Sequence, residues 1–429
     1  MTTITSVTAR EVLDSRGRPT VEADVELSDG TVASASVPSG ASTGRHEARE
    51  LRDGDMERYR GRGVLRAVDN VRTLIAPTVC GLDADFALVD ERMISLDATE
   101  DKSHLGANAT LAVSLAAARA QATSEGVELW EVFAGDMAPE LPLPMVNILS
   151  GGLHAGRQIE FQDFLAVPVG ANTYREALRW VVGIHEAMGD VLRERSLSTL
   201  KADEGGYGPA IAGSIEALEL MDAAVQRAGF LPGRDVVYAL DVAATHFFDP
   251  STRRYRIGGT DRTSAELVEM LAGLAERFAI ASIEDGLAED DWDGWAELTA
   301  RLGDGVQVIG DDLFTTNIAR VRRGVVDRSA NAVLVKMNQI GTLSETLAVV
   351  REAKDAGWRT VISARSGETE DSALADLALG CDGGQIKVGS VTQSERLAKY
   401  NRLLRLEEAL GSAARLARPF AARGQGVRA

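Results

Sequence analysis

The second half of this sequence repeats one pattern, in which a short apolar run ends in a charged side chain. The charged residues at the ends of these runs are Asp241, Glu284, Asp311, Lys336, Arg365 and Lys387. Most neighbouring pairs are roughly 25 residues apart, which is the length of one strand, one helix and two loops. The repeat therefore predicts a parallel β/α barrel.

In such barrels the carboxyl ends of the strands converge on one face, where active sites lie. We therefore expect three carboxylates and two lysines to meet in one pocket. The lysines are informative because the chain has only six of them among 46 basic residues. In a chain this rich in arginine, arginine would be expected at these positions if only positive charge mattered. Arginine does not accept a proton at ordinary pH, so the presence of lysine indicates a role in proton transfer.

The bulk composition narrows the class of protein. The 429 residues suffice for a barrel and a second domain, and 45% hydrophobic content is typical of a soluble globular chain. A net charge of −18 argues against nucleic acid and anionic membranes as partners. Two cysteines cannot form a disulfide framework, and the N-terminus has no apolar signal core. We therefore expect a cytoplasmic location.

The N-terminal part predicts a small α+β domain. Residues 21–27 alternate apolar and acidic side chains, and a turn at Asp29-Gly30 leads to a partner strand at 31–37. Residues 38–44 are small and hydroxylated, which favours a mobile loop near a ligand over a plain connector. Helices are expected at 62–75 and 107–125. Three prolines between 134 and 144 place the domain junction there, giving domains at 1–133 and 134–429.

Three strand-end acids from different strands form a set of hard oxygen ligands. Asp241, Glu284 and Asp311 suit Mg²⁺, although each acid taken alone is better explained as a helix cap or an arginine partner. A lysine beside such a cation and a second lysine has a depressed pKa and can accept a proton. Lys336 is predicted to be this base, and Glu204 is a candidate acid for a leaving group. A lysine base with Mg²⁺ is the pairing known for proton abstraction next to a carboxylate.

Residues near the other strand ends indicate an anion site. Arg365 and Ser366 offer a guanidinium and a hydroxyl, which can bind a phosphate or a carboxylate. The alternative is that Arg365 is a surface arginine on a loop, but its position at a strand end in the same pocket favours the binding site. His154 lies in a glycine-rich loop at 151–156, and Glu204 in an acidic glycine turn at 203–206. The sequence therefore predicts a small, anionic substrate.

At these positions the sequence resembles the enolase family along nearly the whole chain. The matching stretches are residues 11–20, 37–44, 203–206, 282–285, 310–312, 334–343, 365–371 and 384–387. The resemblance implies an enolase-type barrel of order ββαα(βα)6 with an N-terminal α+β domain. It also implies two Mg²⁺ ions per active site, a homodimer or larger homo-oligomer, and conversion of 2-phosphoglycerate to phosphoenolpyruvate, as in glycolysis.

The resemblance also assigns roles to single residues. It implies that Asp241, Glu284 and Asp311 hold the tighter metal and that Ser39 in the loop holds the second. Lys336 takes the proton from C2 and Glu204 assists loss of the C3 hydroxyl. The expected substrate contacts are His154, Asp163, Glu284, Asp311, Arg365, Ser366 and Lys387.

Four positions depart from the family pattern. Enolases read Ser-His-Arg-Ser where this chain has Ala364 in the second place, and Gln-Glu-Phe where it has Asp163. The family's Ser-Glu-Phe is replaced in this chain by Thr-His-Phe, which contains His246. The family's Val-Gly before the acidic turn is replaced by Lys201-Ala202. The metal and base residues are present, whereas polar groups around them are changed.

Three functions follow from these observations. The first is a working enolase. The second is a paralogue that acts on a phosphoenolpyruvate-like phosphonate, similar to the carboxyphosphonoenolpyruvate synthase of phosphonate biosynthesis. The third is a non-catalytic binding protein on the same fold, since fold alone does not establish function. The retained acids and lysines favour the first two.

Overall fold

The computed structural model describes residues 2–40, 43–135 and 139–420. Its first part is an antiparallel sheet of β1 (Ile4–Leu13), β2 (Pro19–Leu27) and β3 (Val32–Ser36). The two predicted strands are β2 and β3, joined by a turn in which Gly30 has φ of 88°. The sequence analysis did not predict β1, which pairs with β2 along its whole length.

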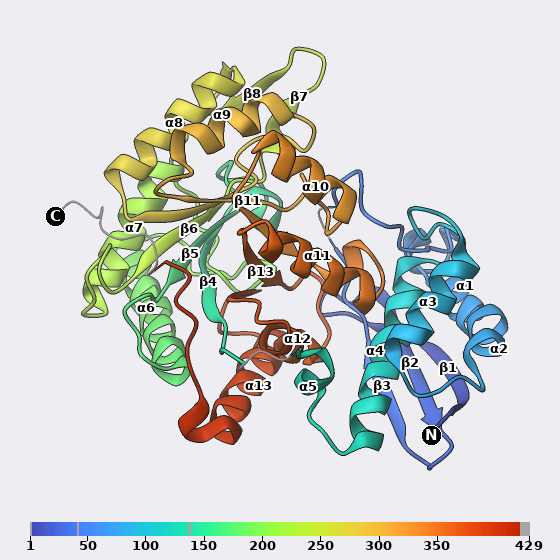
Figure 1. The fold of residues 1–429 in the computed structure, drawn as a ribbon. Helices are drawn as coiled ribbons and strands as arrows, with labels where there is room; N and C mark the ends of the chain where they lie inside the picture. The colour runs from blue at the N-terminus through green and yellow to red at the C-terminus, as the bar shows by residue number, and fades with distance from the viewer. Residues whose placement is uncertain (1, 41–42, 136–138, 421–429) are drawn as a thin grey trace.

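Helices α1 (Leu65–Asn70), α2 (Ala76–Val79) and α4 (Ala107–Glu125) pack against this sheet (Figure 1). Helices α3 (Phe86–Asp97) and α5 (Leu129–Phe133) pack against α4. The single helix expected at 62–75 is wrong in detail, because α1 ends at Asn70 and residues Val71–Ile75 form a π-helical turn. The helix expected at 107–125 is α4.

The alanine-rich helix α4 lies between the first sheet and the barrel (Figure 1). Its small side chains are buried and allow close approach of neighbouring elements. Thr110 donates a hydrogen bond of 2.8 Å to the carbonyl of Gly341, and Ser114 accepts one of 3.0 Å from the amide of Leu343. The helix therefore joins the two parts of the molecule through specific polar contacts as well as apolar packing.

Eight strands form a closed barrel, as the sequence predicts. In chain order they are β4 (Leu143–Ser150), β5 (Asp163–Val167), β6 (Val237–Asp241), β10 (Ile280–Glu284), β11 (Gln307–Gly310), β12 (Ala332–Val335), β13 (Arg359–Ser363) and β14 (Gln385–Gly389). Strand β5 runs antiparallel to β4 and β6, whereas the other neighbouring pairs are parallel. The order ββαα(βα)6 is thus confirmed.

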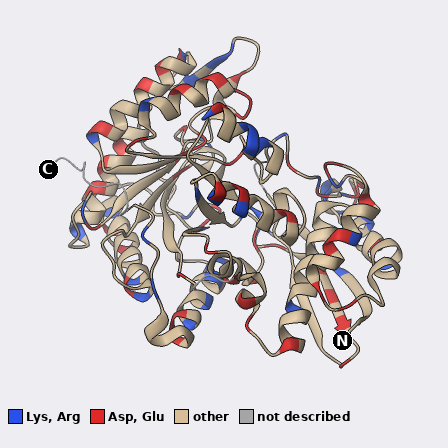
Figure 2. Ribbon diagram, viewed as in Figure 1, with Lys and Arg blue, Asp and Glu red and all other residues tan. Residues whose placement is uncertain are grey.

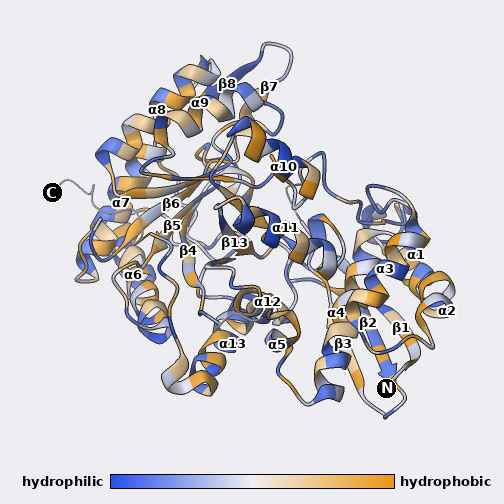
Figure 3. Ribbon diagram, viewed as in Figure 1, coloured by the Kyte–Doolittle hydropathy of each residue, from blue (hydrophilic) through white to orange (hydrophobic). Residues whose placement is uncertain are grey.

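Helices surround the barrel (Figure 1). After β5 come α6 (Tyr174–Glu194) and α7 (Ser214–Arg227) in succession. Each later barrel strand is followed by one helix, in the order α8 (Ser264–Arg277), α9 (Trp292–Leu302), α10 (Ile318–Asp327), α11 (Leu343–Asp355), α12 (Ala373–Gly380) and α13 (Ser394–Leu410). Several begin at a side-chain cap, such as Thr173, Thr263 and Asn317, which satisfies a free amide of the first turn. Apolar and polar residues alternate around them (Figure 3).

A short antiparallel sheet follows β6 and is built from β7 (Phe248–Asp249), β8 (Arg254–Ile257) and β9 (Thr260–Arg262). Acidic and basic side chains are spread over the outer helices of the whole molecule (Figure 2). Among the described residues, no helix has the length and apolar character needed to cross a membrane. Residues 136–138 of the expected domain junction, and 41–42 of the expected loop, lie outside the described residues.

Strand register brings the functional side chains into one row. Asp163 in β5 pairs with Asp241 in β6, and Asp241 pairs with Glu284 in β10. On the other side of the barrel Ser363 in β13 pairs with Lys387 in β14. Residues paired across neighbouring strands are separated by one strand spacing, so these side chains share one end of the barrel.

Candidate active site

A small cavity lies at this end of the barrel. It is lined by His154, Gln162, Glu204, Asp241, Lys336, Ser363, Ala364, Arg365, Ser366, Lys387 and Val388. These residues lie in or next to the strands β4, β5, β6, β12, β13 and β14, whereas Glu204 lies in the loop between α6 and α7. The cavity is therefore a place where acids, two lysines and an arginine face one small volume.

Lys387 lies between two of the predicted metal ligands. Its Nζ atom is 2.8 Å from Asp241 Oδ2 and 2.6 Å from Glu284 Oε2, and all three side chains are buried. Burial disfavours the ammonium, but the two carboxylates outweigh it and raise the pKa of Lys387 well above its ordinary value. Lys387 is therefore a fixed positive charge at neutral pH.

Lys336 pairs with the third acid, Asp311. The other oxygen of Asp311 accepts a hydrogen bond of 2.8 Å from Gln339. Burial lowers the pKa of Lys336, but Asp311 outweighs burial, so protein groups alone raise it. The expectation of a depressed pKa is therefore wrong for the protein groups by themselves, because Asp311 directs its full negative charge at the lysine.

Among the described residues, Asp241, Glu284 and Asp311 do not form a group whose oxygens all lie within 4.8 Å of one another, and Lys387 and Lys336 bond to them instead. Glu284 nevertheless offers an oxygen to a cation. Glu284 Oε1 is buried and has no hydrogen-bond partner among the described residues. Burial and the neighbouring Asp241 raise the pKa of Glu284 to about 8, so its charge is poorly neutralised by the protein. A hard cation that takes carboxylate oxygens would satisfy this atom. Asp241, Glu284 and Asp311 are the residues that would hold Mg²⁺.

A fourth acid, Asp285, positions Asp311 and was not among the predicted site residues. Its two oxygens accept hydrogen bonds of 2.9 Å from the backbone amides of Asp311 and Asp312. One oxygen from each of Asp285, Asp311 and Asp312 lies within 4.8 Å of the other two. The feature of the sequence that could have identified Asp285 is its position directly after Glu284, at a strand end where a side chain can cap the next turn.

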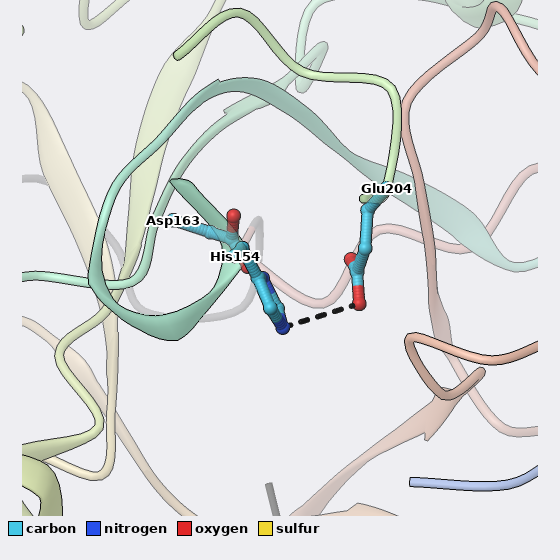
Figure 4. Close-up of side chains that lie close together, drawn as sticks. All are labelled: His154, Asp163 and Glu204. Atoms are coloured by element: carbon cyan, nitrogen blue, oxygen red, sulfur yellow. Dashed lines mark hydrogen bonds and ion pairs between the residues drawn. The ribbon is translucent and has the colours of Figure 1, made fainter. Parts of the chain in front are cut away.

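His154, Asp163 and Glu204 form a line of three buried side chains (Figure 4). His154 Nδ1 lies 2.9 Å from Asp163 Oδ2, and His154 Nε2 lies 3.7 Å from Glu204 Oε1. Burial disfavours the imidazolium, but Asp163 and Glu204 outweigh it and raise the pKa of His154 to about 9. His154 is therefore protonated at neutral pH.

Asp163 does not contact the cavity as a substrate ligand would. One of its oxygens accepts hydrogen bonds from Asn147 at 2.5 Å and Ser150 at 2.9 Å, and the other faces His154. Its side chain is fully buried and it is not among the cavity residues. The substrate contact of Asp163 stays a prediction; in this structure its side chain lies behind His154 and contacts Nδ1.

Glu204 faces the cavity from the acidic turn. Burial raises its pKa, but His154, Arg396 and Lys387 outweigh burial and lower it. Glu204 is therefore ionised in the free protein at neutral pH. To act as the predicted acid it must receive a proton within the complex, and protonated His154 is its nearest proton carrier.

The predicted anion site is formed by Arg365 and Ser366. Arg365 is buried and pairs with Glu47, its Nη1 atom lying 2.8 Å from Glu47 Oε2. The Ser366 hydroxyl accepts a hydrogen bond of 3.2 Å from Arg16. A Cβ atom at Gly367 would lie 2.7 Å from the carbonyl oxygen of Ser39, so only glycine allows the first domain to approach this closely.

Arg396 supports this anion site from behind and was also missed by the sequence analysis. It is fully buried and donates hydrogen bonds to the carbonyl oxygens of Arg365 at 2.5 Å, Ser366 at 2.7 Å and Val388 at 3.0 Å. These carbonyls belong to two neighbouring strand ends. Only the tertiary structure shows that a residue on helix α13 fixes them.

Ser39, expected to hold a second metal, is buried next to the anion site. Its amide donates to Gly367 at 2.8 Å, so the loop pairs with the barrel. Its hydroxyl donates to Glu50 at 3.0 Å and accepts from Arg52 at 2.7 Å. In the part of the chain that the structure describes, the hydroxyl thus bonds to the first domain and not to the three acids.

One departure from the family pattern lies at the cavity. Ala364 forms part of its wall, and its amide donates a 2.9 Å hydrogen bond to the carbonyl of Lys387. Another departure, His246, is half-buried beyond β6 and is not among the residues that line the cavity; burial lowers its pKa.

Two protein-family models match this chain. The model for the enolase N-terminal domain covers residues 4–133, and the model for the enolase C-terminal TIM barrel domain covers residues 138–422. The chain belongs to the enolase family. Family membership supports a lyase of the enolase superfamily, and the structure contains acidic groups that could hold a metal ion.

Proposed function

We propose that this enolase-family protein is a Mg²⁺-dependent lyase that converts 2-phosphoglycerate to phosphoenolpyruvate and water, or the reverse. The observation that carries the proposal is that Lys336, Glu204, Asp241, Arg365 and Lys387 line one cavity. A base, an acid, a metal ligand and an anion site within one small volume are the parts that this reaction requires.

The substrate phosphate is proposed to bind Arg365 and Ser366. Lys387 lies beside Asp241 and Glu284 and adds a permanent positive charge near the substrate carboxylate. Asp241, Glu284 and Asp311 would hold Mg²⁺, which would supply positive charge beside that carboxylate and so lower the pKa of Lys336. The proton of C2 then passes to Lys336 Nζ.

Glu204 and His154 act on the other side of the substrate. His154 carries a proton and lies 3.7 Å from Glu204. Glu204 is proposed to pass a proton to the C3 hydroxyl so that it leaves as water. Asp163 keeps His154 in place through its 2.9 Å contact with Nδ1.

The direct test is the absorbance of the enol product. Purified protein with 2-phosphoglycerate and Mg²⁺ is expected to form phosphoenolpyruvate, and a chelator is expected to stop the reaction. Absence of turnover in metal-loaded protein would reject this function. We also propose that the protein forms a homodimer or a larger homo-oligomer in the cytoplasm. Gel filtration with light scattering tests the oligomeric state.

A second function is favoured by Ala364 and Asp163. Ala364 leaves space in the cavity wall, and Asp163 is withdrawn behind His154. These two changes support a paralogue that acts on a phosphoenolpyruvate-like phosphonate. In that case Ala364→His with Asp163→Glu should raise hydratase activity from a low starting value. Wild-type activity equal to that of an ordinary enolase would contradict the second function, and absence of both Mg²⁺ and phosphonate binding would favour a non-catalytic protein.

A further inference from the structure

Lys201 has surroundings unlike those of the other lysines. The remaining five each pair with a carboxylate: Lys102 with Glu345, Lys336 with Asp311, Lys354 with Asp382, Lys387 with Asp241 and Glu284, and Lys399 with Glu368. In the described part of the chain, no carboxylate lies within ion-pair distance of Lys201. Its contacts are an imidazole and an aromatic ring.

The neutral pocket of Lys201 is built by two stacked rings. Its Nζ atom lies 2.9 Å from His185 Nε2 and 3.3 Å from the centre of the Tyr207 ring. The two rings stack with centroids 4.7 Å apart. His185 is 4% exposed, whereas Lys201 is exposed at the surface. The amine is thus held in a defined place and remains accessible to small molecules.

This environment makes the amine of Lys201 easier to deprotonate than that of an ordinary lysine, although the face of Tyr207 stabilises its ammonium. Partial burial, followed by the nearby cation Arg193, lowers the pKa of Lys201 to about 8. Burial and Lys201 lower the pKa of His185 to about 4, so this imidazole is neutral and adds no compensating charge. Desolvation and a neighbouring cation are the two features that make lysine amines nucleophilic in proteins.

We propose that Lys201 is a modification site that accepts an acyl group from an acyl phosphate. The Nζ lone pair attacks the acyl carbon and forms an amide bond. The bond between that carbon and the phosphate oxygen breaks, and phosphate leaves with the electron pair. The proton lost by the nitrogen passes to solvent. Arg193, which also pairs with Asp190, adds positive charge near Lys201 that favours an anionic donor over an uncharged one.

The site lies at the start of the turn that carries Glu204. The amide of Ala202 donates a 2.8 Å hydrogen bond to the carbonyl of Gly206, which closes this turn. Lys201 itself bridges to Tyr207 through the backbone. Acylation of Lys201 replaces its ammonium with a neutral amide beside this turn. The family pattern has an apolar residue at this position.

The test measures acetylation of each lysine in the full-length protein. The chain is incubated with acetyl phosphate, and mass spectrometry of its peptides gives initial rates. Lys201 is expected to react about tenfold faster than Lys354 at pH 8. Its rate should level off above about pH 8. Equal rates at Lys201 and Lys354, or a Lys201 rate that does not level off, would overturn the proposal, whether or not the protein shows lyase activity.

Two variants test the cause of the selectivity. Asp382→Asn removes the carboxylate from Lys354 at the surface, so acetylation of Lys354 should become severalfold faster while Lys201 is unchanged. No change at Lys354 would contradict the argument from charge pairing. Arg193→Gln should slow the reaction of Lys201 with acetyl phosphate more than with uncharged N-hydroxysuccinimidyl acetate. An equal effect on both donors would overturn the assignment to an acyl phosphate.

Discussion

Arg396 donates a 2.7 Å hydrogen bond to the carbonyl oxygen of Ser366 from behind the wall of the candidate active site. The same guanidinium bonds the carbonyls of Arg365 and Val388. A fully buried cation thus fixes two neighbouring strand ends and adds positive charge near an anion site. Buried charges are costly, so this arrangement is expected to matter for binding as well as for folding.

Arg396→Met should weaken binding of inorganic phosphate and raise the KM for 2-phosphoglycerate. Loss of hydrogen bonds from a charged group costs about 1.5–3 kcal/mol, or roughly a tenfold to hundredfold change. Calorimetry with phosphate measures this without turnover. Arg405→Met on the exposed side of the same helix is the matched control. Unchanged phosphate affinity together with a lower Tm would show that Arg396 has only a structural role.

Asp163→Asn should disturb His154 while leaving the metal acids in place. The pKa of His154, raised to about 9 by Asp163 and Glu204, should fall toward its ordinary value. Nuclear magnetic resonance of the imidazole measures this shift, and kcat should fall about tenfold or more. Asp163→Glu, which keeps the charge, serves as the comparison. A His154 pKa that stays at 9 in Asp163→Asn would disprove the positioning role.

Lys336→Arg should abolish proton abstraction although it keeps the positive charge, because arginine does not accept a proton at ordinary pH. A loss of about 10²–10⁴ in kcat is expected. Exchange of the C2 proton of 2-phosphoglycerate with deuterated water reports this step separately from loss of the hydroxyl. Substantial exchange in Lys336→Arg would mean that another group is the base.

Removal of Mg²⁺ should destabilise the folded protein. A cation present at a hundred times its Kd adds about 2.7 kcal/mol to the free energy of unfolding. Thermal melts with Mg²⁺ and with a chelator measure this difference. Glu284→Gln should remove most of the response, because Glu284 Oε1 is the buried oxygen left without a partner. A Tm that does not respond to Mg²⁺ would argue against the site.

Asp90→Asn should make the protein more stable at pH 8. Asp90 lies in α3 and accepts a 2.8 Å hydrogen bond from the amide of Ser344 in α11, and burial raises its pKa to about 6. The unfolded carboxyl titrates near 3.8, so the wild-type protein loses stability as pH rises from 3.8 to about 6. The variant should gain up to about 3 kcal/mol at pH 8 and little at pH 4. Denaturant unfolding at both pH values checks this, and a difference independent of pH would contradict it.

The barrel and the row of strand-end residues were predictable because strand order and side-chain direction follow from local sequence. Each apolar run forms a strand, and the residue after it must lie at the same end of the barrel. This reasoning placed Asp241, Glu284, Lys336, Arg365 and Lys387 in one region, and the cavity, with the contacts around it, brings them together. The antiparallel direction of β5 came only through the resemblance to a known family.

The residues that support the site were not predictable in the same way. Arg396 and Asp285 act through backbone groups of other segments, and nothing in their local sequence shows which carbonyl or amide they will meet. The placement of Asp163 behind His154 depends on one methylene of side-chain length and on the depth of the strand in the barrel.

The sequence by itself determined the class of fold and the chemical character of the pocket, because periodic apolar runs and the charges that end them are local properties. The tertiary structure decided which of those charges are neutralised and which are not. Lys336 pairs with Asp311, while Lys201 meets only aromatic and imidazole groups. Charge pairing depends on distances between segments far apart in the chain, and these distances are fixed only when the whole core has packed.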